Sequence, residues 1–375
     1  MKQKLVEPRL VEFFHRKAEK TGTPISGTFE LSPLCNMDCR MCYIKMTKEK
    51  QESIARLRRN EEWIELAKEA REQGLLFLLL TGGEPFLVEN FKELYIELHK
   101  MGFCISINTN GTMIDENVIE WLRKYPPMRI NMTLYGASNE TYEKLCRNPK
   151  GFTQVKRAIS LLKENNLQVK LNCSVTPYNK DDLKAMIEFA NDNDLIIQAT
   201  SYMFPPLRKD ESLVGQNDRF TPEDAALYGA YIGAYQNGYD NFKSYVESGE
   251  LAIYDADDDC GVVEGDKMRC RAGLTSFWMT WEGKLLPCGM IPDKGLDPWE
   301  VGFTKAWENA RNIVKEIKLP VKCAGCAKKN QCRACAAMVY TETGTYDKLP
   351  QYRCDMTNHY PDACKKVLEE LKTQL

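Results

Sequence analysis

Short apolar runs alternate with amphipathic stretches along the chain as far as about residue 205. Six of these runs are expected to be β-strands, at residues 27–31, 76–80, 103–108, 129–134, 168–175 and 195–202. Between the strands, apolar side chains recur at helical spacing, as Trp63, Leu66 and Ala70 do. Gly74 and Gly102 stand where the first two of these helices should end. The pattern therefore predicts six strand–helix units in series.

Such a series favours a parallel sheet with its helices outside. Residues 75–80 are apolar at every position, as expected of a strand buried on both faces. Because six units are too few for a closed eight-stranded barrel, we expect an α/β fold of the partial (β/α)6 TIM-like barrel type. A flat, doubly wound sheet is the alternative. In both folds the chemistry should lie at the carboxyl ends of the strands.

The rest of the chain has a different pattern. Thr221 to Asp224 have the features of a helix start, and the tyrosines that follow at helical spacing are expected to form a packed face. Beyond Cys260 the alternation stops, and regular structure should be sparse until a final helix at residues 363–371. We therefore expect four parts: an N-terminal helical extension (1–24), the barrel (25–205), a helical bridge (206–255) and a metal-held domain (256–375).

Composition excludes several classes of protein. Of 375 residues, 43% are hydrophobic and 28% charged, which is ordinary for a globular protein. The net charge of −2 provides no basic surface for nucleic acid or an anionic membrane. The longest apolar run is far shorter than the roughly 20 residues of a membrane span, and no secretory signal is visible. We expect a cytoplasmic protein with no nucleic-acid or membrane partner.

Cysteine is the unusual residue, with 15 copies against three histidines. Disulfides are not expected, because the cytosol keeps thiols reduced. So many thiols indicate metal, and the shortage of histidine disfavours mixed Cys/His zinc sites. Three of the cysteines, Cys35, Cys39 and Cys42, share one short loop directly after the first strand. They could hold three irons of a 4Fe-4S cluster and leave the fourth iron open, with a zinc site as the alternative.

A second motif, Gly82-Gly83-Glu84-Pro85, follows the second strand. Two glycines allow the backbone to approach closely, and Glu84 offers an acceptor at the carboxyl end of a strand. The two motifs in this order resemble the radical S-adenosylmethionine (SAM) superfamily, over about residues 25–205.

The resemblance implies a partial (β/α)6 barrel in which a 4Fe-4S cluster on Cys35, Cys39 and Cys42 chelates the methionine amine and carboxylate of SAM. It also implies SAM contacts: Gly82, Gly83 and Glu84 along the amine, Tyr43 near the adenine, Asn108 near the ribose, Thr133 at the end of the fourth strand and Arg147 on the carboxylate. For Arg147, a surface ion pair is the alternative.

Eight cysteines concentrate towards the C-terminus: Cys260, Cys270, Cys288, Cys323, Cys326, Cys332, Cys335 and Cys354. Alone, their CxxC pairs could be a zinc ribbon. Behind such a barrel, they resemble the SPASM domain, which carries two auxiliary 4Fe-4S clusters. The resemblance assigns Cys270, Cys288 and Cys335 to the first cluster, with Cys260 as fourth ligand. It assigns Cys323, Cys326, Cys332 and Cys354 to the second.

Two ligand roles stay open. The gap before Cys335 is two residues, where the SPASM pattern has three. Without Cys260, the first auxiliary cluster would keep an open iron that could bind substrate.

Four cysteines have no place in the three clusters: Cys104, Cys146, Cys173 and Cys364. Buried hydrophobic thiols are expected at Cys104 and Cys173, with a role inside the barrel as the alternative for Cys173. The acids at 255 and 257–259 are expected to be a solvated loop, or else to supply a base.

The resemblance implies three 4Fe-4S clusters, reductive SAM cleavage to a 5′-deoxyadenosyl radical, and hydrogen abstraction from a substrate C–H bond. A flavodoxin or ferredoxin would supply electrons. We expect a radical SAM oxidoreductase that installs a thioether or carbon–carbon crosslink in a ribosomally synthesised precursor peptide. The barrel begins near residue 25, which leaves no room for a winged-helix module, so a separate leader-recognition protein could be a partner. The alternatives are a dehydrogenase of an alcohol or thiol carbon, as in sulfatase maturation or aminoglycoside oxidation, and a non-enzymatic zinc or electron-transfer protein.

Overall fold

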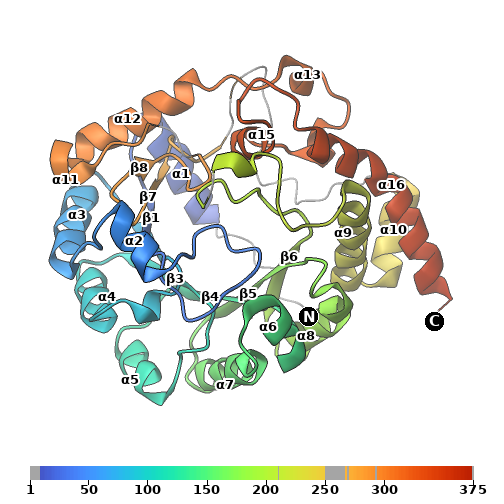
Figure 1. Cartoon of the computed structure of the whole chain (residues 1–375), viewed down its shortest axis with the longest axis horizontal. Coiled ribbons are helices and arrows are strands. Elements are labelled where there is room, and N and C mark those ends of the chain that lie inside the picture. The colour runs from blue at the N-terminus through green and yellow to red at the C-terminus, as the bar shows by residue number, and fades with distance from the viewer. Residues whose placement is uncertain (1–8, 210, 250–266, 268–269, 292–293, 374–375) are drawn as a thin grey trace.

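The structure is a computed structural model that describes residues 9–209, 211–249, 267, 270–291 and 294–373 (Figure 1). Its strands form one eight-stranded sheet in the order β6-β5-β4-β3-β2-β1-β7-β8. The strands are β1 Ser26–Glu30, β2 Phe77–Thr81, β3 Cys104–Thr109, β4 Arg129–Thr133, β5 Val169–Ser174, β6 Ile196–Thr200, β7 Ser276–Met279 and β8 Leu285–Leu286.

Strands β1 to β6 are those that the hydrophobic pattern predicts, and each pairs in parallel with its neighbour in sequence. Figure 1 shows the helices arranged as a ring outside the strands. The prediction of a partial (β/α)6 barrel is therefore confirmed. The helices of this part are α1 Arg9–Thr21, α2 Lys48–Ile54, α3 Asn60–Glu72, α4 Phe91–Lys100, α5 Glu116–Lys124, α6 Asn139–Cys146, α7 Gly151–Glu164 and α8 Leu183–Asp192.

The two faces of the barrel strands differ in chemistry. One face is apolar and fully buried, and its row Leu80, Ile107 and Ile130 is fixed by the strand register. The other face is polar, because the same register places polar side chains side by side across β4, β5 and β6. Three of these are Thr133, Asn172 and Gln198. Since Thr133 and Asn172 are half-buried and Gln198 is exposed, solvent reaches this polar face.

The sheet also contains a strand from the C-terminal part of the chain. β7 pairs in parallel with β1, so that Thr28 lies opposite Trp278, and β8 pairs antiparallel with β7. The C-terminal part thus continues the barrel sheet beyond its first strand. A pattern of six strand–helix units gave no indication of this pairing, because β7 has only four residues.

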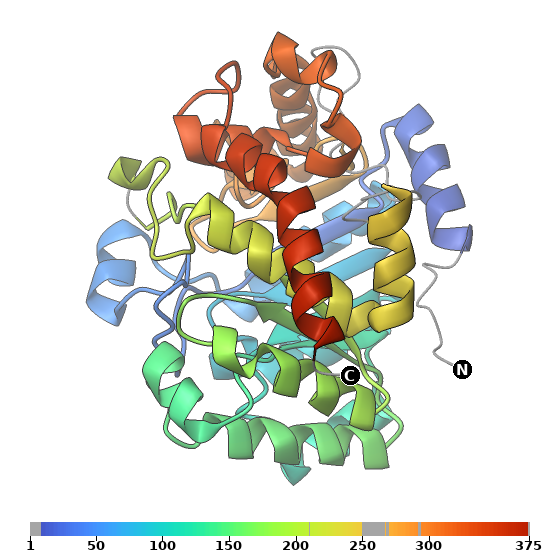
Figure 2. The same ribbon diagram turned by 90° about the vertical axis from the view of Figure 1, so that its right-hand side faces the viewer.

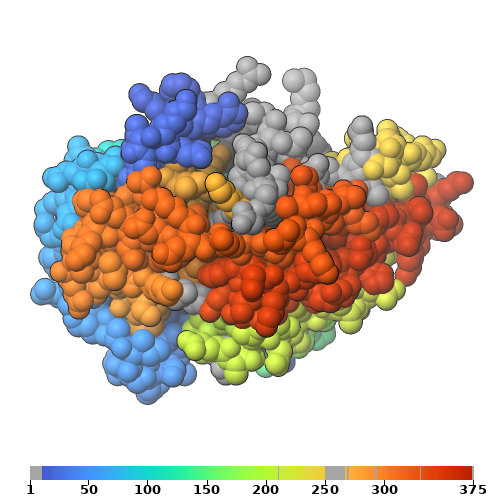
Figure 3. All heavy atoms as spheres, turned by 90° about the horizontal axis from the view of Figure 1, so that it is seen from above, coloured from blue at the N-terminus to red at the C-terminus, as the bar shows by residue number. Residues whose placement is uncertain are grey.

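Sparse regular structure after Cys260 is a prediction that proves wrong. The last helix begins at Gln351 rather than at residue 363, because Met356, Tyr360 and Val367 give it an apolar stripe that packs along α9 (Figure 2). The helices after β6 are α9 Pro222–Asn237, α10 Tyr239–Ser248, α11 Pro298–Val301, α12 Phe303–Glu316, α13 Val321–Ala324, α14 Lys329–Cys332, α15 Ala336–Thr343 and α16 Gln351–Lys372. In Figure 3 the orange-to-red C-terminal residues form a continuous band across one side of the molecule.

The predicted start of the bridge helix is correct. The Thr221 hydroxyl accepts the backbone N–H of Asp224 at 3.1 Å, which caps α9. The tyrosines of this helix form a packed face, as expected: the Tyr228 ring stacks on Phe220 with 4.7 Å between centroids, and Tyr231 and Tyr235 continue the stack.

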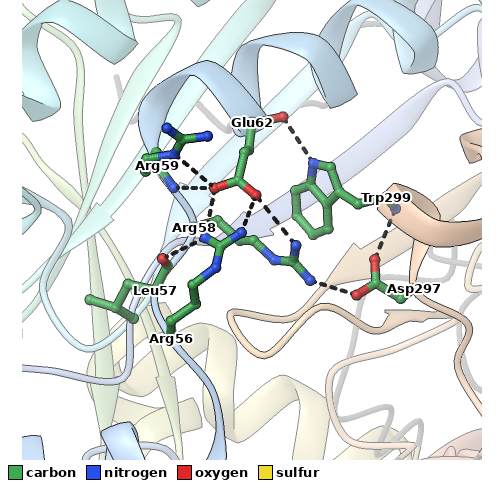
Figure 4. Close-up of polar contacts among 7 residues, drawn as sticks. All are labelled: Arg56, Leu57, Arg58, Arg59, Glu62, Asp297 and Trp299. Atoms are coloured by element: carbon green, nitrogen blue, oxygen red, sulfur yellow. Dashed lines mark hydrogen bonds and ion pairs between the residues drawn. The ribbon is translucent and has the colours of Figure 1, made fainter.

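A polar cluster attaches α3 to the C-terminal part (Figure 4). Arg58 binds Asp297 at 2.6 Å and lies over the ring of Trp299, 4.3 Å from its centroid. The Trp299 indole donates to the carbonyl of Glu62 at 3.0 Å. Because these bonds join residues more than 230 positions apart, they fix the C-terminal part against the first strand–helix unit. No described helix is both long and apolar enough to cross a membrane.

Candidate active site

The three-cysteine loop follows β1 and lies on the end of α6. The backbone N–H groups of Asp38 and Arg40 donate to the carbonyls of Cys146 and Leu145, each at 3.0 Å, and Arg40 Nε donates to the Lys144 carbonyl at 3.1 Å. A helix leaves its last carbonyls without internal partners, so the loop satisfies three acceptors at once. The end of α6 therefore fixes where the cysteines lie.

The glycines of the second motif allow the end of β2 to approach the chain that leads into this loop. Gly83 N donates to Ser32 O at 2.7 Å, and Glu84 N donates to Leu34 O at 2.9 Å. A Cβ on Gly83 would lie 2.2 Å from the Leu34 carbonyl oxygen, and one on Gly82 would lie 2.5 Å from Ser32 O. Only glycine fits here, and the pairing fixes the chain immediately before Cys35.

Glu84 joins the ends of β2 and β3. Its buried carboxylate accepts the Thr109 hydroxyl and the Asn110 backbone N–H, each at 2.8 Å, and the Phe86 N–H at 3.2 Å. Burial raises the pKa of Glu84 to about 7, while these three hydrogen bonds oppose the increase. The sequence predicts a contact with SAM for Glu84, and the structure adds this structural role.

Asn110 is a residue that the sequence reasoning missed. Its amide donates to Asn36 Oδ1 at 2.8 Å and lies 3.7 Å from Cys35 Sγ. Asn108, which was expected near the ribose, accepts the Asn131 amide at 2.8 Å on the polar face of the strands. The repeated asparagines around Thr109 were the available signal. Their roles differ because Asn108 lies within β3, whereas Asn110 lies just beyond its end.

The thiols of the loop are close enough to influence one another. Burial raises the pKa of Cys35 to about 12, and Glu84, Cys39 and Cys42 add to the increase. The pKa of Cys39 is lowered by a hydrogen bond from Cys146, which the sequence left without a role. Cys146 is fully buried at the end of α6, so a fourth thiol touches the loop.

Three other predicted SAM contacts, Tyr43, Thr133 and Arg147, have different surroundings. The Tyr43 side chain lies close to the charges of Glu30 and Arg208 and to the Cys288 thiol, and burial raises its pKa. Thr133 is half-buried on the polar face. Arg147 is exposed and follows α6 with a left-handed φ of 58°; among its neighbours is Asp38.

A buried ion pair joins β1 to the chain after β6. Arg208 binds the Glu30 carboxylate with both terminal nitrogens, at 2.5 and 2.6 Å, and the Trp278 indole of β7 donates to the same carboxylate at 2.9 Å. Glu30 is completely buried. The ring of Trp278 packs against Gly289, where a Cβ would lie 2.6 Å from the ring. The pair therefore connects the strand before the cysteine loop with the segment that contains Cys288.

The C-terminal cysteines fall into two groups. The thiols of Cys323, Cys326, Cys332 and Cys354 influence one another, and burial raises the pKa of Cys323 to about 11. Cys335 and Cys288 lie elsewhere, against a small apolar core that includes Ile291, Ile313 and Val339. The ligand sets that the resemblance implies stay a prediction. Cys260 and the acids at 255 and 257–259 lie outside the described residues, as does the predicted domain boundary near residue 256.

Several backbone N–H groups point at cysteine sulfurs, and these contacts indicate whether the cysteines fit iron–sulfur clusters. The N–H donors are Met37 on Cys35 at 3.4 Å, Lys45 on Cys42 at 3.2 Å, Ala272 on Cys270 at 3.4 Å and Met290 on Cys288 at 3.5 Å. A neutral thiol is a weak acceptor, whereas iron-bound sulfur accepts such bonds and its potential responds to them. In the described part of the chain, no three Cys, His or acidic side chains converge tightly enough for a single metal ion. The four N–H groups that point at cysteine sulfurs are the observation that fits iron–sulfur clusters at these residues.

Cys173, a buried cysteine on β5, has no part in this site. The Cys173 thiol faces α8, 3.7 Å from the sulfur of Met186, and is 2% exposed. Burial alone raises its pKa to about 12. The expectation of a small buried hydrophobic residue is therefore correct, and its side chain points away from the polar face.

Comparison with known proteins decides the family of the barrel. Residues 29–190 match the model of the radical SAM superfamily, and both cysteine and glycine motifs fall within that range. The chain contains a radical SAM domain. The radical SAM family implies one 4Fe-4S cluster and SAM.

Two curated relatives match beyond the radical SAM domain. The AdoMet-dependent heme synthase of Methanosarcina barkeri (strain Fusaro / DSM 804) is 24% identical over 339 residues, which cover 87% of this chain and 95% of that protein. The antilisterial bacteriocin subtilosin biosynthesis protein AlbA of Bacillus subtilis (strain 168) is 23% identical over 273 residues, 72% of this chain and 56% of that protein.

Two solved structures share the fold. SuiB of Streptococcus suis, bound to its precursor peptide SuiA, aligns with a TM-score of 0.65 at 15% identity over 91% of this chain and 79% of that chain. The structure of anSMEcpe with bound AdoMet aligns with a TM-score of 0.68 at 18% identity over 94% and 100%. At these identities the likeness shows the fold alone. Both alignments extend well past the radical SAM domain, so the arrangement of the C-terminal part is shared as well.

Proposed function

We propose that this chain is a radical SAM oxidoreductase that modifies a ribosomally made precursor peptide, by forming a thioether or carbon–carbon crosslink. The observation that carries the proposal is the polar face of the barrel beside the cysteine loop. Thr133, Asn172 and Gln198 line up there across three strands. Amide and hydroxyl groups both donate and accept hydrogen bonds, which suits the peptide groups of an extended substrate. AlbA is named as a bacteriocin biosynthesis protein, and SuiB binds the precursor peptide SuiA, which supports the same substrate class.

In this proposal, Cys35, Cys39 and Cys42 hold one 4Fe-4S cluster and leave one iron for SAM. When bound, the cluster and SAM supply a 5′-deoxyadenosyl radical that removes hydrogen from a substrate C–H bond. The chain's own residues contribute by holding the cysteine loop in position. The end of α6 and the Gly83 pairing hold the loop, and Glu84 holds the ends of β2 and β3 beside it. Gly82, Tyr43, Asn108, Thr133 and Arg147 remain proposed contacts of SAM.

The C-terminal part is proposed to be a SPASM domain with two auxiliary 4Fe-4S clusters. Cys270, Cys288, Cys335 and Cys260 would hold the first, and Cys323, Cys326, Cys332 and Cys354 the second. A flavodoxin or ferredoxin is the proposed reductant, and a separate protein is the proposed reader of the leader peptide.

Metal analysis and SAM cleavage test the cluster assignments. Three clusters correspond to about twelve irons per chain. Replacing Cys35, Cys39 and Cys42 together by Ala should remove about four irons and abolish 5′-deoxyadenosine formation. Cys354→Ala should lose auxiliary iron but retain some uncoupled SAM cleavage. Zinc in place of iron, or SAM cleavage by the triple variant, would contradict the proposal.

Mass spectrometry tests the reaction. The reconstituted enzyme is incubated with SAM, a reductant and peptides encoded beside its gene. Crosslinking gives a product lighter by two hydrogens, with tandem fragments missing between two residues. The same mass loss with a complete fragment series would identify a dehydrogenase, the alternative in which a single alcohol or thiol carbon is oxidised.

A second candidate substrate is a small molecule with carboxylates, such as a tetrapyrrole. The heme synthase relative is matched over almost its whole length, and Lys170 lies opposite Asn131, a member of the polar face. Lys170 donates to Gln198, which reduces its availability for a carboxylate. SAM cleavage stimulated by porphyrins, and by none of the peptides, would favour this candidate.

A further inference from the structure

Arg353, on the first turn of α16, is among the largest side chains that are fully buried, at 1% exposure. Its Nε and one Nη donate to the carbonyl of Cys332, at 3.0 and 2.6 Å. The other Nη lies 3.1 Å from the sulfur of Met356. The guanidinium also faces the ring of Tyr202, 5.6 Å from its centroid. All of these partners are uncharged.

No carboxylate of the described chain neutralises Arg353. The nearby acids are committed elsewhere: Glu342 binds Arg219 with both oxygens, and Asp355 accepts the Gln351 amide. A buried cation without a counter-charge is costly, because it loses water and gains no ionic partner. Capping the last carbonyl of α14 accounts for the hydrogen bonds to Cys332, but it does not require a buried charge.

The cysteines on either side of Arg353 offer the missing negative charge. Cys354 follows it directly, Cys332 is its hydrogen-bond partner, and both influence Cys323. A cluster of four irons, four sulfides and four thiolates has a net charge of about −2 when oxidised and about −3 when reduced. Net charge and burial are among the factors that set its potential.

We propose that the Arg353 guanidinium is the buried counter-charge of the second auxiliary cluster and raises its reduction potential. This inference rests on the ligand set of the proposed function. Reduction adds one electron from an external low-potential donor and makes the cluster more negative, so a fixed cation stabilises the reduced state more than the oxidised state. No proton moves, because Arg remains protonated throughout.

The sharpest test changes a neighbour and leaves Arg353 in place. Met356→Glu and Met356→Gln have nearly the same size, and differ by one charge next to the guanidinium. A redox titration of the reconstituted full chain, followed by electron paramagnetic resonance, gives the midpoint potential of the signal that disappears in Cys354→Ala. Met356→Glu should lower the equilibrium constant for reduction at least tenfold relative to Met356→Gln, which is 59 mV for one electron.

Direct replacements complete the test. Arg353→Met should lower the reduction equilibrium constant at least tenfold, whereas Arg353→Lys, which keeps the charge, should stay within about threefold of wild type. Lys322→Met removes an exposed charge beside Cys323 and should also stay within about threefold, because water screens it. Equal potentials in Met356→Glu and Met356→Gln, or an equal fall in Lys322→Met and Arg353→Met, would overturn the proposal.

For variants that do not bind the second auxiliary cluster, the iron content of the purified chain is the measurement. If Arg353→Met and Met356→Glu both lose the cluster while Met356→Gln and Arg353→Lys keep it, the cation is needed to hold the anionic cluster, as proposed. Loss of the cluster from Met356→Gln as well would show a packing role and would overturn the inference. If Cys354→Ala keeps all of its iron, the ligand set of the proposed function fails instead.

Discussion

The carboxylate of Glu84, at the end of β2, accepts the backbone N–H of Asn110, just beyond β3, at 2.8 Å. Since Asn110 also donates to Asn36 in the cysteine loop, one buried carboxylate orders two strand ends and, through them, the loop. Glu84→Gln replaces an acceptor by a donor that must face an existing N–H or O–H group. We expect the free energy of unfolding to fall by about 1–3 kcal/mol, measured by denaturant titration. An unchanged value would show that Glu84 does not hold these strand ends.

The same residue should make stability depend on pH. Burial raises the pKa of Glu84 from 4.5 to about 7, so the folded chain binds more protons than the unfolded chain between these values. Stability from this group is therefore full below pH 4.5 and is lost as the pH rises through 7. The loss should approach about 3 kcal/mol in wild type and be absent from Glu84→Gln. Identical pH profiles of the two proteins would contradict this prediction.

The buried ion pair of Glu30 and Arg208 should be strongly coupled. Arg208→Met leaves Glu30 buried without a cation, at a cost of about 3–5 kcal/mol in unfolding free energy. The double variant Glu30→Gln, Arg208→Met should be more stable than Arg208→Met alone, because neither charge is then left unpaired. Lys68→Met, which breaks an exposed pair with Glu65, is the control and should cost less than about 1 kcal/mol. If the stability losses of Glu30→Gln and Arg208→Met measured separately add up to the loss in the double variant, the two residues are not coupled.

The backbone at Leu34 lies so close to Gly83 that no side chain should fit there. Gly83→Ala places a methyl group 2.2 Å from the Leu34 carbonyl oxygen, so the chain before Cys35 must move. Iron bound by the three-cysteine loop and 5′-deoxyadenosine formation should both fall at least tenfold. Gly233→Ala in α9 is the matched control, because its nearest neighbour lies at 3.5 Å and helices favour Ala over Gly by about 1 kcal/mol. Full iron loading of Gly83→Ala would show that the loop does not depend on this pairing.

Substitutions of the two neighbouring arginines Arg58 and Arg59 should differ in their effect on stability. Arg58 is mostly buried between Asp297 and Trp299, whereas Arg59 is exposed (Figure 4). Arg58→Met should cost about 1–3 kcal/mol, and hydrogen exchange of residues 297–303 should accelerate. Arg59→Met should change stability by less than about 0.5 kcal/mol and leave exchange there unchanged. Equal exchange rates in both variants would argue against the α3 contact as an anchor of the C-terminal part.

Local patterns were sufficient to predict the barrel. Apolar positions at strand spacing, separated by stretches of helical spacing, located β1 to β6. β2 is a continuous apolar run, whereas β4 and β5 alternate apolar and polar residues, which agrees with one buried and one polar face. Motif spacing located the cysteine loop and the glycine pair in the same way. These features depend on residues close together in sequence, which is where a pattern is informative.

Contacts between distant residues were not predictable. The pairing of β7 with β1 involves four residues that no turn signal links to the barrel. The contact of Cys146 with Cys39 depends on how α6 packs, and the start of α16 depends on the apolar stripe that α9 covers. For Arg353, the sequence shows an ordinary arginine beside a cysteine, and only the fold shows that its charge is buried without a carboxylate.

The pairing of β1 with β7 also constrains how the protein is made. Ser26 and its partner Ser276 are separated by about 250 residues, and translation at roughly 5–20 residues per second needs on the order of 10–50 seconds to cover that interval. During this time the outer edge of the first strand has no partner, and an open edge pairs readily with other chains. The growing chain thus passes through a ribosome-bound stage in which its first strand must be protected until the residues of β7 have been synthesised.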